Sequence, residues 1–277
     1  MAGQDLDFGM PWHDALMPLG KNYLAIERCV VECANAGCDT IWIVCNDDMQ
    51  PLIRYRIGEM VQDPVWVLRA FSYNKREHQK PIQVHYVPIN SRDIKKRDCL
   101  SWSVLHGATV ANKICGGISS WVRPDKYYVS WPYGYYLPTI VRKHRNLISS
   151  RKSFFLTFDD KTVRDGEYLG FTFGKEELEQ LRSEVIEKST GLWKDPNKRD
   201  EALPLEERFS YRNFHLSDVF DTLATDEVEL VELEEYCRID SWERYCQYIS
   251  DHGMLVKRPS KFILNYKEWN GIGVDDE

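Results

Sequence analysis

Two short polar stretches of the sequence carry side chains that could bind a charged ligand. The densest basic run contains Arg92, Lys95, Lys96 and Arg97, and such cationic groups are common ligands of phosphate. The same run could instead be a solvated loop. Residues 46–48 (Asn-Asp-Asp) follow an apolar run. Their carboxylates could coordinate a cation at the end of a strand, or cap the next helix.

An aromatic block at residues 131–136 (Trp-Pro-Tyr-Gly-Tyr-Tyr) is the third stretch that could contact a ligand. Aromatic rings can stack on a nucleobase or a sugar, but rings at the end of a strand also pack within a core. The residues alone leave both interpretations open.

The eight cysteines and seven histidines do not form a pattern of known chemistry. Cys29 and Cys33 would share one helix face, which could suit a metal, but no second Cys pair in the CxxC spacing of zinc sites accompanies them. We therefore interpret the cysteines as reduced core thiols. The histidine spacing gives no support for a Ser-His-Asp or Cys-His hydrolase.

Composition limits the class of protein and of partner. The 277 residues suffice for one large domain, and the 43% hydrophobic fraction is typical of a globular fold. A net charge of −7 argues against a broad nucleic-acid-binding surface. No basic leader segment or apolar stretch of about eighteen residues is found, so we expect a cytoplasmic protein outside the membrane.

Helices and strands alternate in the first half of the chain, which predicts an α/β protein with a mainly parallel, doubly wound sheet. The pattern begins with an amphipathic helix that Gly37 can end and an apolar, β-branched strand that follows at once. In order, we expect a helix at 22–36, a strand at 39–45, a helix at 50–60, a strand at 82–87, a helix at 99–114 and a strand at 126–131.

The second half predicts a smaller antiparallel addition. We expect a helix at 137–147, strands at 153–158 and 168–173, and helices at 175–188 and 242–250. Residues 189–213 contain two prolines and many charges, which indicates a loop or flap. The predicted organisation is therefore one domain at 1–250 that includes this flap, followed by a tail at 251–277, which could pack on the domain or on a partner.

Several motifs in order along the chain resemble those of the sugar-1-phosphate nucleotidyltransferases. The first is a Pro-Leu-Gly-Lys turn that feeds a helix, and the last resembles the family's W-x-D-I-G-T-x-E-x-Y segment. The matching stretches are residues 15–21, 36–44, 97–104, 168–178, 217–223 and 236–245. The chain also looks like proteins carried by tailed marine phages.

The resemblance implies a GT-A-like Rossmann fold that joins a nucleoside triphosphate to a sugar phosphate with the help of Mg²⁺. Lys21 and Asp240 would be catalytic, and Asp240 would hold the metal ion, although it could equally cap the following helix. The residues that the resemblance assigns to nucleotide binding are Gly3, Arg97, Ser101, Trp131 and Tyr133.

The sequence departs from the family at three places where chemistry is expected. Asp14 stands where the family has a catalytic lysine, and a carboxylate there repels phosphate. Residues 131–136 hold no carboxylate where the family has its first metal aspartate. The family's first strand and signature arginine have no match before Ala15. The alternative is a non-catalytic binding protein, or a structural protein that forms a homo-oligomer or an assembly and retains the fold.

Overall fold

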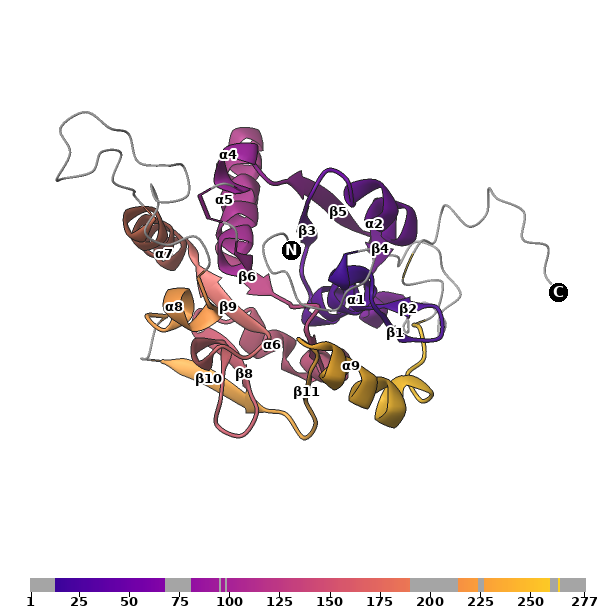
Figure 1. The fold of residues 1–277 in the computed structure, drawn as a ribbon. Coiled ribbons are helices and arrows are strands. Elements are labelled where there is room, and N and C mark those ends of the chain that lie inside the picture. Colours follow the sequence, from indigo (N-terminus) through magenta and orange to yellow (C-terminus); the bar gives the residue numbers. More distant parts are fainter. Residues whose placement is uncertain are drawn as a thin grey trace, which may run out of the picture.

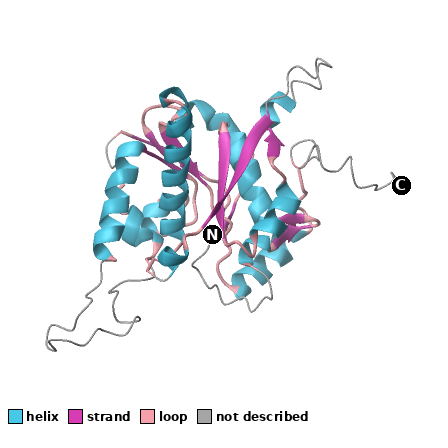
Figure 2. Ribbon diagram, turned by 90° about the horizontal axis from the view of Figure 1, so that it is seen from above, coloured by secondary structure: helices cyan, strands magenta, loops and turns pink. Residues whose placement is uncertain are grey.

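The computed structural model describes residues 13–67, 81–94, 96–97, 99–189, 214–223, 227–259 and 264. Gly3 and residues 190–213 of the expected flap lie outside this part of the chain. Helices and strands alternate through most of it, with helices on both sides of the strands (Figures 1 and 2). None of the described helices is long and apolar enough to cross a membrane.

The first sheet has the strand order β3 (Thr40–Cys45), β5 (Pro81–Pro88), β4 (Met60–Gln62). Strands β3 and β5 are parallel and β4 is antiparallel to β5. Helices α1 (Ala25–Ala36) and α2 (Gln50–Ile57) share a core with one face of this sheet. Helix α5 (Leu100–Ile118) packs on the other face, where Gly107 lies against the Val44 side chain.

The second sheet has the strand order β10 (Val228–Glu232), β8 (Ser153–Thr157), β9 (Phe171–Gly174), β6 (Lys126–Val129). Only β10 and β8 run parallel. One face shares the largest core cluster with helices α5, α7 (Lys175–Lys188) and α8 (Leu216–Phe220). The opposite face packs with α6 (Arg145–Ile148) and the end of α1.

Two small antiparallel ribbons and two short helices complete the described structure. One ribbon pairs β1 (Pro18–Gly20) with β2 (Tyr23–Leu24), and the other pairs β7 (Gly134–Tyr135) with β11 (Cys237–Arg238). Helix α4 (Ser91–Ile94) precedes α5, and helix α9 (Trp242–Tyr248) follows β11. Short 3-10 helices span Asp14–Leu16, Ser120–Val122, Ile140–His144 and Val163–Asp165, and a π-helical turn spans Ile249–Gly253.

The α/β class is confirmed, whereas the expectation of one mainly parallel sheet is only partly met. Within the described residues, parallel pairing is limited to β3 with β5 and β8 with β10, and no strand joins β3 to β6. The antiparallel share is larger than expected because the β8–β9 connection contains only a short 3-10 helix. Without a crossover helix, β9 returns beside β8 in the opposite direction.

Most predicted elements are present, and the differences concern their ends. Helix α7 has the predicted bounds, and α1 ends at Gly37 in the left-handed conformation, with φ of 90°. The predicted helix at 137–147 is instead a 3-10 helix followed by α6. Pro138 cannot stand inside an α-helix because it lacks the amide donor, so regular helix begins only after it.

Part of the predicted tail packs back on the first half of the molecule. Lys257 forms a β-bridge with Lys21 at the turn of the β1–β2 ribbon. Leu264 forms another with Val61 of β4 and is fully buried. At the positions that the structure describes, the tail is therefore part of the folded unit.

Candidate functional site

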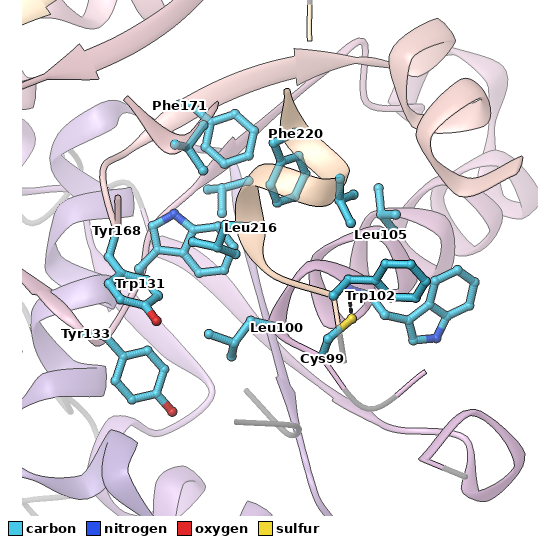
Figure 3. Close-up of a cluster of buried hydrophobic side chains, with 14 of the residues drawn as sticks. Cys99, Leu100, Trp102, Leu105, Trp131, Tyr133, Tyr168, Phe171, Leu216 and Phe220 are labelled. Atoms are coloured by element: carbon cyan, nitrogen blue, oxygen red, sulfur yellow. Dashed lines mark hydrogen bonds between the residues drawn. The ribbon is translucent and has the colours of Figure 1, made fainter. Parts of the chain in front are cut away.

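The structure brings the start of α5 next to the aromatic block that follows β6. Leu100, the first residue of α5, lies in one buried cluster with Trp131 and Tyr133 (Figure 3). Ser101 is the next residue of the helix. Trp131 and Tyr133 therefore share a core cluster with the first residue of α5, and Ser101 lies at the same helix start.

Helix α5 begins with a well-defined cap. The thiol of Cys99 accepts the amide hydrogen of Trp102 at 3.4 Å, and the hydroxyl of Ser103 donates to the Cys99 carbonyl oxygen at 3.3 Å. The helix has 19 residues, and the free amide groups at the start of such a helix attract negative charge. The positive end of the α5 dipole therefore lies in this region.

Ser101 and Tyr133 are both buried polar residues whose hydroxyl groups lack a hydrogen-bond partner. Each side chain is fully buried, and neither oxygen has a partner in the structure. Burial, followed by the charge of Asp14, raises the pKa of Tyr133, so its phenol stays protonated. An unpaired buried hydroxyl costs about 1–3 kcal/mol, and the described residues contain other buried polar atoms without a partner, such as the hydroxyls of Tyr23 and Tyr127.

Trp131 is a packing residue in this structure. Its indole nitrogen donates to the Leu169 carbonyl oxygen at 3.1 Å. Its ring stacks on Phe171 and meets Tyr168 and Phe220 edge-on (Figure 3). The indole is buried among these rings, which matches the packing alternative. Ligand stacking on Trp131 stays a prediction.

The aromatic block is held in place by a buried ion pair on α1. Arg28 donates to the carbonyl oxygen of Trp131 at 2.6 Å and pairs with Glu32, one helical turn later, at 2.9 Å. Both side chains are fully buried. The guanidinium also lies 4.7 Å from the centre of the Tyr136 ring.

Glu32 accepts hydrogen bonds from three hydroxyl groups about a hundred residues away in the sequence, which are those of Tyr128, Ser130 and Tyr136. Burial, followed by the Glu32 charge, raises the pKa of both tyrosines well above the usual value. They therefore remain protonated and donate. This network fixes the position of the block relative to α1.

Asp240 lies beside the aromatic block, but its carboxylate is engaged by arginines. The amide of Ile239 donates to the Tyr133 carbonyl oxygen at 2.7 Å, as an extension of the β7–β11 pairing. One oxygen of Asp240 accepts from Arg238 and the other pairs with Arg244 at 2.5 Å. Ser241 is the N-cap of α9, so Asp240 precedes the cap and is not itself the capping residue.

The arrangement around Asp240 does not suit Mg²⁺ as it stands. A divalent ion would have to displace both arginines, and Mg²⁺ binds through carboxylates and other oxygen ligands. Across the described residues, no three His, Cys, Asp or Glu side chains lie close enough to share a metal ion. An open hollow of about 550 Å³ is lined by Asp240, Ser241, Glu243, Arg244 and Gln247. The metal-binding role of Asp240 stays a prediction.

Arg97 contacts the start of α5 through Trp102, and Lys21 lies at the turn of the β1–β2 ribbon. Arg97 pairs with Asp93 at 2.9 Å, stacks over Trp102 at 4.7 Å and donates to Ser189 at 2.6 Å. These contacts connect the segment before α5 to the end of α7, so a phosphate would compete with them. Lys21 is exposed at the turn between β1 and β2.

Sequence reasoning missed the residues that organise the site. Arg28 and Glu32 are four residues apart on one helix, and that spacing is a detectable signal for an ion pair. Their partners at 128–136 are about a hundred residues away and left no local signal. In the sequence, Asp14 was interpreted only as a departure from the lysine of the family. In the structure, its charge lies near Tyr133.

Comparisons with known proteins support the fold described above. No protein-family model matches the sequence, and no curated protein matches it. Among solved structures, UDP-glucose pyrophosphorylase complexed with UDP-glucose is similar, with 13% identity, a TM-score of 0.52, and coverage of 90% of this chain and 95% of that chain. The fold is nucleotidyltransferase-like.

A second similar structure is a nucleoside-diphosphate-sugar pyrophosphorylase from Vibrio cholerae RC9. It is 11% identical, with a TM-score of 0.49, and the match covers 91% of this chain and 98% of that chain. At such identities the similarity shows the fold alone, so chemistry has to be argued from the site. The resemblance to phage proteins finds no support in these comparisons.

Proposed function

We propose that this nucleotidyltransferase-like protein binds a nucleotide at the start of α5, against residues 131–136. The observation that carries the proposal is the pair of fully buried, unpartnered hydroxyls of Ser101 and Tyr133. A nucleobase or ribose offers several donors and acceptors that could satisfy both groups. Because both hydroxyls are buried, binding includes a local opening of the structure.

The electrostatic field in the same region favours the negative charge of a nucleotide. The first amides of α5 and the positive end of its dipole attract phosphate. Arg28 is too deeply buried to contact a ligand directly, and its charge is paired with Glu32. Asp14 opposes this field near Tyr133, which favours binding of the nucleoside part there and of the phosphates nearer to α5.

Transfer chemistry has weaker support than binding. A nucleotidyl transfer needs cations around the phosphates in the transition state. The two predicted catalytic groups are Lys21, at an exposed turn, and Asp240, which is paired with two arginines. A sugar-phosphate partner and a Mg²⁺ cofactor are proposed on the family resemblance alone, so they are tested together with activity.

The test is an incubation of the purified full-length protein with Mg²⁺, each nucleoside triphosphate and a panel of sugar phosphates. Thermal shift reports binding, and pyrophosphate release reports transfer. We expect a rise in Tm with at least one nucleotide, which follows from ligand binding to the native state. The same nucleotide should bind Ser101→Ala and Tyr133→Phe at least tenfold more weakly.

Tyr127→Phe is the matched control. Tyr127 also has a buried hydroxyl without a partner, but its charged neighbours are Cys115, Arg123 and Asp125, at the opposite end of β6. Its removal should leave nucleotide affinity unchanged. Absence of any shift with every nucleotide would contradict the proposal and favour a structural or assembly role.

A further inference from the structure

The end of helix α1 brings Cys33 and Cys38 close together. The proposed function involves neither of them. Gly37 adopts the left-handed conformation, its amide donates to the Ala34 carbonyl oxygen, and the Cys38 amide donates to the Cys33 carbonyl oxygen at 3.2 Å. These two bonds define a Schellman motif. In this motif the side chains of the residues at the positions of Cys33 and Cys38 characteristically touch.

The backbone geometry suits a bridge between the two thiols. Through the 3.2 Å bond, standard bond lengths limit the distance between the Cα atoms of Cys33 and Cys38 to at most about 7 Å. Disulfides span Cα distances of about 4.4 to 6.8 Å.

Cys33 and Cys38 are more exposed to solvent than most other cysteines that the structure describes. Cys33 and Cys38 are both partly exposed, whereas Cys29, Cys45, Cys99 and Cys115 are buried. Cys33 packs at the edge of the core shared by α1, α2 and the first sheet, and Cys38 packs at the edge of the core beneath α6. A bridge would therefore join the margins of two core clusters.

We propose that Cys33 and Cys38 form an oxidative modification site, at which a peroxide closes a reversible intramolecular disulfide. The thiolate of one cysteine attacks a peroxide oxygen, the O–O bond breaks, and hydroxide leaves and takes up a proton, which gives a sulfenic acid and water. The second thiol attacks the oxidised sulfur and loses its proton, and a second water leaves. Two thiols and one hydrogen peroxide thus yield one disulfide and two waters.

Either thiol of the pair can react first with the peroxide, and the other then acts as the resolving partner. The thiolate is the nucleophilic form in both steps.

The test uses the folded full-length protein with hydrogen peroxide, followed by maleimide labelling of the remaining thiols, digestion and mass spectrometry. We expect the peptide that carries Cys33 and Cys38 to lose two hydrogens, to carry no label on either residue and to recover both labels after dithiothreitol. The mapping needs no variant. It overturns the proposal if both residues remain labelled, or if the bridge joins either of them to another cysteine.

Variants then test the two sulfurs. Cys33→Ser and Cys38→Ser should each abolish the bridge, and the remaining cysteine of the pair should form a sulfenic acid that dimedone traps. Cys246→Ser is the matched control, because it removes an exposed thiol outside the pair and should retain the bridge in full. Absence of dimedone labelling on the remaining cysteine in both variants would contradict the proposal.

Discussion

The guanidinium of Arg28 donates a 2.6 Å hydrogen bond to the carbonyl oxygen of Trp131, at the point where β6 runs into the aromatic block. The same arginine pairs with Glu32, and Glu32 accepts hydroxyl groups from Tyr128 and Tyr136. One turn of α1 therefore sets the position of the segment that forms half of the candidate site.

Arg28→Met should destabilise the protein strongly. The substitution leaves the Glu32 carboxylate buried without its cation, and loss of one partner of a buried ion pair costs about 3–5 kcal/mol. Urea unfolding followed by circular dichroism measures the change in the free energy of unfolding.

The double variant with Arg28→Met and Glu32→Gln separates this mechanism from loss of packing. The neutral amide can still accept the tyrosine hydroxyls, so the double variant should be more stable than Arg28→Met alone by about 1 kcal/mol or more. Additive losses in the two single variants would show that the two residues do not act as a pair.

Gly134→Ala should disrupt the aromatic block. A Cβ atom at this position would lie 2.2 Å from the Tyr168 carbonyl oxygen, a backbone atom that cannot easily move. Overpacking of this kind costs about 1–3 kcal/mol, and the shift of residues 133–135 should also weaken nucleotide binding. Chemical unfolding and a thermal-shift titration measure the two effects.

Gly117→Ala is the control for this substitution. A Cβ at Gly117 of α5 meets nothing within 4 Å, and alanine has the higher helix propensity, so a gain of up to about 1 kcal/mol is expected. If both variants lost the same stability, the close approach of Gly134 to Tyr168 would not be the cause.

Ser101→Ala and Tyr133→Phe should separate stability from binding. Each substitution removes a buried hydroxyl that has no partner, so the free protein should be as stable as the wild type or more stable by about 1 kcal/mol. Nucleotide affinity should fall in the same variants. A loss of stability without a change in affinity would assign these hydroxyls to the fold.

The stability of the protein should fall as the pH drops below about 6.5, with a contribution from His85. His85 stacks on Trp42 at 4.3 Å, and burial lowers its pKa from 6.5. The unfolded chain therefore takes up this proton at a higher pH than the native state does, so the stability that His85 contributes is present above pH 6.5 and is lost as the pH falls through the native pKa.

His85→Gln provides the measurement. Tm values of wild type and variant between pH 8 and pH 5 should show a shallower acid-side decrease for the variant. The contribution is modest because the ring is partly exposed. Parallel curves for the two proteins would exclude His85 as a source of the pH dependence.

Local signals in the sequence were sufficient to locate most elements of the fold. Gly37 marked the end of α1, the apolar run at 40–45 gave β3, and the charged amphipathic stretch at 175–188 gave α7 with the predicted bounds. Strand direction was harder to predict because it depends on the connections. The return of β9 beside β8 follows from the loop between them, and no single strand carries that information.

The candidate site was only partly visible in the sequence. Ser101, Tyr133 and Asp240 were selected by resemblance. Tyr133 shares a core cluster with Leu100, and Ile239, the residue before Asp240, donates to the Tyr133 carbonyl oxygen. The sequence could not show which hydrogen-bond and ion-pair partners each side chain has. The ion pairs of Asp240 and the Arg28–Glu32 network depend on contacts between distant segments, which the spacing of residues along the chain does not encode.

Photo-crosslinking with an azido-nucleotide, followed by tryptic digestion and mass spectrometry, tests the location of the nucleotide most directly. We expect adducts on the peptides 98–113 and 127–142, which contain Ser101 and Tyr133, and we expect competition by the unmodified nucleotide. Adducts confined to other peptides, or adducts that the unmodified nucleotide does not displace, would contradict the proposed site.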